Sequence, residues 1–168
     1  MTTYPEFVAS RIKPLPTRIE RLEHAILGMV GEIGEIADAY KKHWIYERPL
    51  DTVNMLEELG DLRFYIQMAI NEDLTPSSIP LASRGSFFKN LMTLTQSVGH
   101  FQLDIETNQV EHQKLSLSRI LCQFTSLCLQ MGVTEEEVIQ KNIEKLTKRY
   151  PTVYSNEAAI ARADKLKP

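Results

Sequence analysis

The chain has 168 residues, of which 43% are hydrophobic and 24% are charged, enough for one domain with a substantial core. Its 19 lysines and arginines nearly balance 22 acids, and a net charge of −3 argues against a general nucleic-acid-binding protein. No apolar run approaches the roughly 20 residues of a membrane span, and the N-terminus lacks the layout of a signal peptide. We therefore expect a soluble cytoplasmic protein (in the host cytoplasm if virus-encoded) that binds neither nucleic acid nor membranes.

Five stretches with helical periodicity follow one another along the chain, and strand signals are weak throughout. Thr17 opens the first and Thr134 the last, each with an acid three residues later that completes a capping box. The expected helices cover residues 17 to about 48, 51 to 71, 87 to 106, 111 to 131 and 134 to 151. The sequence therefore predicts an all-α bundle of about five helices.

We expect these helices to form a single domain over residues 1–168. Its expected parts are a loose N-terminal segment (1–16), an acidic helix pair (17–71), two inserted helices (72–131) that follow a Pro/Ser-rich connection (74–86), a further helix (132–151) and a tail (152–168). Cys122 and Cys128 point in different directions on one expected helix, so they cannot form a disulfide with each other there. Buried, reduced thiols are the simplest interpretation.

Two pairs of carboxylates lie three residues apart on the first two helices, Glu32 with Glu35 and Glu58 with Asp61. Glu58 falls within an apolar arc of its helix, and Asp61 lies at the edge of that arc. A buried, unpaired carboxylate is costly, so Glu58 needs a cation or a proton. The second helix is apolar on two sides, which places it at a bundle centre or a subunit interface.

An all-oxygen donor set of this kind favours a hard divalent cation, Mg²⁺ with Mn²⁺ as a substitute. A di-iron bundle requires Glu-x-x-His pairs, and none of the four histidines follows a glutamate at that spacing. Four of the seven glycines, Gly28, Gly31, Gly34 and Gly60, lie within the same two helices, where each costs about 1 kcal/mol relative to alanine. They indicate either close approach of a ligand or tight helix packing.

Three sequence blocks carry a family resemblance. GEIGEIAD at 31–38 followed by EELGD at 57–61 resembles the E-x-x-E…E-x-x-D signature of the MazG-like all-α nucleoside triphosphate pyrophosphohydrolases. NIEKLTKRYP at 142–151 is similar to that family's later N-x-x-K-L-x-x-R-Y helix. The intervening insertion resembles the longer five-helix members, which include dimeric dUTPase-like and dCTPase-like enzymes. Some phage MazG-like relatives prefer dGTP, so a purine nucleotide also remains a candidate substrate.

The resemblance implies a Mg²⁺-dependent hydrolase that converts a (d)NTP to the (d)NMP and pyrophosphate and so controls nucleotide pools. It also implies a homodimer or homotetramer. By carry-over, the metal ligands are Glu32, Glu35, Glu58 and Asp61, and the substrate-side residues are Asn142, Lys145 and Arg149. Glu35 is the candidate general base. Lys42, on the same helix arc as Glu35, is a candidate phosphate ligand, and Trp44 is a candidate to stack on the base.

Two other functions remain open at this point. A non-enzymatic helical oligomerisation or interaction protein would use the second helix as an interface and leave its acids solvated. An enzyme similar to phosphoribosyl-ATP pyrophosphohydrolase would share the carboxylate chemistry and differ only in its substrate.

Overall fold

The structure is a computed structural model that describes residues 2–77, 82 and 85–161. Within this part of the chain all regular structure is helical. The helices are α1 (Tyr4–Ala9), α2 (Arg18–Trp44), α3 (Thr52–Ile70), α4 (Phe87–Glu106), α5 (Val110–Met131), α6 (Glu135–Arg149) and α7 (Asn156–Ala161). The all-α prediction is confirmed, and the five expected helices correspond to α2 through α6.

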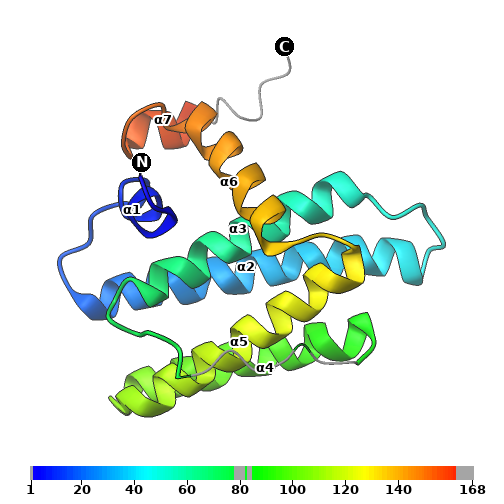
Figure 1. Cartoon of the computed structure of the whole chain (residues 1–168), viewed down its shortest axis with the longest axis horizontal. Coiled ribbons are helices and arrows are strands. Elements are labelled where there is room, and N and C mark those ends of the chain that lie inside the picture. The colour runs from blue at the N-terminus through cyan, green and yellow to red at the C-terminus, as the bar shows by residue number, and fades with distance from the viewer. Residues whose placement is uncertain (1, 78–81, 83–84, 162–168) are drawn as a thin grey trace.

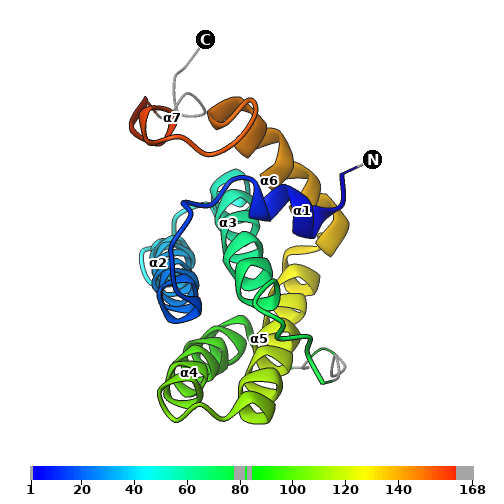
Figure 2. The same cartoon turned by 90° about the vertical axis from the view of Figure 1, so that its left-hand side faces the viewer.

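Helices α2 to α5 form two antiparallel pairs, α2 with α3 and α4 with α5, and α6 crosses over α3 at the edge of this bundle (Figure 1). Helix α3 lies at the centre (Figure 2), because it packs against α1, α2, α5 and α6. Side chains on several of its sides are accordingly buried, including Met55, Phe64 and Met68. The predicted burial of the second acidic helix on two faces is therefore observed, with this helix at the bundle centre.

The helix ends follow from local sequence. Thr17 caps α2 and Thr134 caps α6, and each accepts a backbone N–H from the glutamate three residues on while that glutamate accepts the cap's own N–H. Gly132 ends α5 with φ of 70°, a left-handed conformation that glycine adopts without steric cost. These three signals set the ends of α2, α5 and α6 within about two residues of the predicted positions.

The N-terminal segment differs from the expectation, because residues 4–9 form helix α1 and the segment was expected to lack regular structure. Thr3 and Glu6 make a capping box, and Pro5 lies in the first turn, where its missing N–H has no cost. Phe7 and Val8 are buried and belong to the hydrophobic core. The expected tail likewise contains α7, although none of its residues is buried.

Part of the expected connection (78–81 and 83–84), the end of the tail (162–168) and Met1 lie outside the described residues. Cys122 and Cys128 are both buried and form no disulfide, as predicted, and burial raises the pKa of Cys128 to about 12. Over the described part of the chain, every helix is too short or too polar to cross a bilayer.

Candidate metal and substrate site

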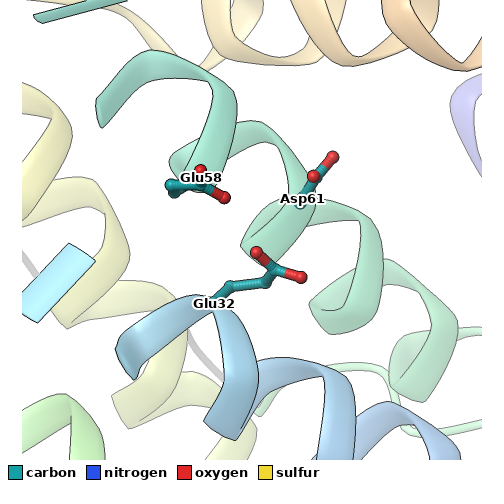
Figure 3. Close-up of side chains that lie close together, drawn as sticks. All are labelled: Glu32, Glu58 and Asp61. Atoms are coloured by element: carbon teal, nitrogen blue, oxygen red, sulfur yellow. The ribbon is translucent and has the colours of Figure 1, made fainter. Parts of the chain in front are cut away.

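Three of the four predicted carboxylates converge between α2 and α3. Glu32 on α2 and Glu58 and Asp61 on α3 each offer an oxygen, and these oxygens lie within 4.8 Å of one another. Figure 3 shows Glu32 reaching from α2 toward α3, where Glu58 and Asp61 lie close by. Spacing of three residues puts Glu58 and Asp61 on one face of α3, and the pairing of α2 with α3 brings Glu32 opposite them.

Because the cluster is largely buried, keeping its carboxylates ionised costs free energy. Glu58 is 9% exposed, and the Asp61 side chain is 19% exposed. Burial, together with the nearby charges of Asp61 and Glu58, raises the pKa of Glu32 to about 8. A bound cation would stabilise the ionised form of the three carboxylates, because it would offset their mutual repulsion and replace the hydration that they lose on burial.

Helix α6 contributes two polar side chains to the same site. The Asn142 amide, 2% exposed, donates a hydrogen bond of 2.9 Å to Asp61 Oδ1. Lys145 forms an ion pair with the other oxygen of Asp61 and lies 3.9 Å from Glu57 Oε2. The N-x-x-K spacing places Asn142 and Lys145 on one face of α6, so two of the three predicted substrate-side residues reach the carboxylate cluster.

Of the four glycines in the acidic helices, two serve tight helix packing and two leave open space that a ligand could approach. A Cβ at Gly28 would lie 2.2 Å from the Tyr65 ring, and one at Gly60 would lie 3.2 Å from Asn142 Cβ. These two glycines serve helix packing, and Gly60 lets α6 approach α3. Gly31 and Gly34 have nothing within 4 Å of a Cβ, and Gly31 lines the cavity beside the carboxylates.

That cavity has a volume of about 400 Å³ and is bounded by both acidic helices and α6. Its lining includes Glu35, Asn54 and Lys145 together with the three carboxylates. Glu35 is exposed and lies outside the tight group of three oxygens. It therefore faces the same space as the cluster without belonging to the tight set of ligand atoms.

The remaining predicted residues lie around this centre. Lys42 is paired with Asp38 at 2.6 Å and lines an adjacent cavity that Glu35 also lines. Trp44 is 68% exposed, and its ring is stacked parallel to that of Tyr40. Arg149 lines a separate cavity that shares Glu32 and Asp61 with the cluster.

Two residues of the site were missed in the sequence. Asn54 lies one turn before Glu58 on α3 and lines the cavity with it, so the i, i+4 spacing was a usable signal. Tyr4 on α1 donates a hydrogen bond of 3.3 Å to Asn142 Oδ1. No local pattern links Tyr4 to a residue so far along the chain, since only the packing of α1 on α3 brings it there.

The donor set fits a divalent cation of the Mg²⁺ or Mn²⁺ type. All three ligand atoms are carboxylate oxygens, which hard cations prefer, and thiol or imidazole ligands are absent from this group of described residues. Three protein oxygens also leave positions for water and phosphate, as Mg²⁺ requires in nucleotide sites.

Comparison with known proteins gives one match. A family model described as dUTPase matches residues 12–150, which include both acidic helices, the inserted helices and α6. Searches of curated proteins and of solved structures found no match. The family match is the type of relationship that the three sequence blocks predicted, and it confirms the predicted superfamily.

Proposed function

The chain belongs to the dUTPase family, of the all-α MazG-like type, and on this basis we propose that it is a Mg²⁺-dependent nucleotide pyrophosphohydrolase. The reaction converts a (d)NTP, with dUTP the first candidate, to the (d)NMP and pyrophosphate. One observation carries the proposal: three carboxylate oxygens from two helices lie within 4.8 Å of one another beside a lysine. We also propose that residues 1–168 form a single catalytic domain.

Glu32, Glu58 and Asp61 would hold the cation, with Glu35 as a further ligand or as the base. A bound divalent cation neutralises charge on the phosphates and lowers the pKa of an attacking water. Because Asn142 and Lys145 both contact Asp61, they fix that carboxylate on the side of the site where α6 approaches.

Proton transfer falls to Glu35. Its side chain is exposed and faces the cavity that holds the cluster, so it can accept a proton from water without giving up a place in the tight ligand set. Lys145 and Arg149 supply positive charge around the polyphosphate, and Lys42 adds positive charge on the Glu35 side of the site. Asn142, the remaining substrate-side residue, holds Asp61 in place through its hydrogen bond. Trp44, exposed near the end of α2, is the candidate to stack on the base.

We also propose a homodimer or homotetramer. Large apolar side chains are exposed on α2 and α4, among them Leu27 (72%), Val30 (55%) and Phe88 (58%). Val30 borders an apolar groove between these two helices. Light scattering across a range of concentrations tests this assembly, and a monomer throughout would contradict it.

The function is tested with a panel of canonical (d)NTPs and dUTP in the presence of Mg²⁺, with pyrophosphate and orthophosphate scored separately. We expect pyrophosphate release, its loss in Glu58→Gln, and its retention in the control Glu23→Gln, which changes an exposed acid of α2. Orthophosphate as the sole product would contradict the reaction class. Adding phosphoribosyl-ATP to the panel tests the alternative substrate, and the absence of both turnover and Mg²⁺-dependent stabilisation would favour a non-enzymatic interaction protein.

A further inference from the structure

A second cavity adjoins the metal cluster on the side of the N-terminal segment. Its volume is about 220 Å³, and two of the cluster's carboxylates, Glu32 and Asp61, form part of its lining. Arg11 and Lys13 enter it from the segment that follows α1, and Arg149 enters it from the end of α6. The cavity thus brings three cationic side chains from distant parts of the chain next to the metal ligands.

The charge of this cavity suits an anion. None of the ion pairs among the described residues involves Arg11 or Lys13. The only acids in the lining are Glu32 and Asp61, and a divalent cation held by these two would cancel their charge. Guanidinium and ammonium groups then remain to pair with phosphate oxygens.

Two buried nitrogen atoms of the lining residues also lack a partner. Arg11 Nε and His24 Nδ1 are both buried without a hydrogen bond in the described structure, and both residues line this cavity. Burial and the nearby Lys13 lower the pKa of His24, so its imidazole is neutral near pH 7 and can donate or accept one bond at Nδ1. A buried polar group without a partner is costly, and a polar ligand would remove that cost.

The fold holds one of the two N-terminal cations, Arg11, in place. The Arg11 guanidinium lies 4.4 Å from the centre of the Phe7 ring, and Phe7 is buried in the core. The carbonyl of Ser10 accepts a hydrogen bond of 2.9 Å from the backbone N–H of Tyr154. Ser10 and Arg11 are therefore fixed between α1 and the chain that follows α6, which lowers the entropic cost of using Arg11 as a ligand.

We propose that this cavity is the subsite for the β- and γ-phosphates of the substrate, and for the pyrophosphate product, with Arg11 and Lys13 as phosphate-binding residues. The assignment rests on the proposed function. A volume of about 220 Å³ lies below the roughly 300 Å³ at which pockets begin to hold whole drug-sized ligands, so it suits a diphosphate group alone. The nucleoside then extends into the adjoining cavity of about 400 Å³ that Glu35 and Asn54 line.

The test is direct binding of pyrophosphate in the presence of Mg²⁺, measured by calorimetry on the full chain. We expect Arg11→Met and Lys13→Met each to weaken pyrophosphate binding by about 10- to 100-fold, the value of one lost charge-assisted hydrogen bond. Both variants should raise KM for the triphosphate. Lys141→Met, which removes an exposed lysine of α6 from outside this cavity, should leave the affinity unchanged.

Because Arg11 packs on Phe7, Arg11→Met can also disturb α1. Arg11→Lys is therefore measured beside it, since this variant retains the positive charge. Lys13→Met provides an independent measurement, because no described hydrogen bond or ion pair involves the Lys13 ammonium group. Unchanged pyrophosphate affinity in folded Lys13→Met and Arg11→Met would overturn the assignment. A loss of affinity for the nucleoside monophosphate with unchanged pyrophosphate binding would also overturn it, because the cavity would then be a base subsite. If the wild-type chain binds pyrophosphate through these residues but hydrolyses no triphosphate, the phosphate site is supported and the proposed function fails.

Discussion

In the metal-free protein, Glu32 is expected to reduce stability as the pH rises. Burial and the neighbouring carboxylates raise its pKa from 4.5 to about 8, while in the unfolded chain the group keeps its ordinary value. The folded state therefore holds a proton that the unfolded state has released, and stability falls with rising pH between these two values. Glutamine at position 32 resembles the protonated acid in shape and cannot ionise, so Glu32→Gln removes this effect.

The size of the effect follows from the two pKa values. Near pH 7 the solution is about 2.5 pH units above the unfolded pKa and still below the folded one. At about 1.36 kcal/mol for each unit, ionisation in the unfolded state costs the native protein at most about 3 kcal/mol, and solvent screening of this half-buried group reduces the cost to about 1–2 kcal/mol. For a chain of this length 1 kcal/mol corresponds to roughly 2–4 °C. Glu32→Gln should therefore melt about 2 to 8 °C above the wild type near pH 7.

The measurement is thermal unfolding of both proteins in a chelator, near pH 5 and near pH 7, and again with Mg²⁺ near pH 7. The advantage of the variant should fall to about a quarter of its value near pH 5, because that pH lies only about 0.5 units above the unfolded pKa. Added Mg²⁺ should raise the midpoint of the wild type more than that of the variant, which has lost a ligand. Glu23→Gln on the same helix is the control. A variant less stable than the wild type in chelator near pH 7, or an advantage that does not depend on pH, would refute this account of the cluster.

Three further changes test the packing and charge around the site. Gly28→Ala forces a Cβ into the Tyr65 ring and should cost about 1–3 kcal/mol in denaturant unfolding; an unchanged midpoint would contradict the close contact. Gly31→Ala has open space around its Cβ and should gain up to about 1 kcal/mol from helix propensity, whereas a loss of activity in this stabilised variant would indicate that a ligand lies against the bare backbone. Lys145→Met removes a cation paired with Asp61 and should tighten Mg²⁺ binding roughly five- to tenfold in a titration without nucleotide; weaker binding would show that Lys145 does not compete with the metal.

The long helices could be predicted because each carries its own signals. Thr17 and Thr134 begin capping boxes, and apolar periodicity extends from each cap. Helix α1 has the same kind of cap at Thr3, but six residues are too few for a periodic pattern to stand out. An isolated helix of that length is unstable in water, so α1 depends on burying Phe7 and Val8 in the core, which only the assembled fold reveals.

The site was predictable to the extent that its residues share a helix. Spacing alone places Glu58 with Asp61 and Asn142 with Lys145. It also treats Glu32 and Glu35 as equivalent ligands, and the structure separates them, since α3 packs on the side of α2 that carries Glu32.

This separation strengthens the division of roles within the acidic pair. Glu32 is half-buried, close to Glu58 and Asp61, and protonated more readily than an ordinary acid, which suits a ligand that needs a cation to ionise. Glu35 is exposed at the same cavity and can change its rotamer and exchange protons with water, which suits a base. The place of Arg11 and Lys13 in the site could not be predicted from the sequence, because no helical spacing relates them to the acids. They reach Glu32 and Asp61 only because α1 docks on α3, so the phosphate end of the proposed site is a consequence of tertiary packing.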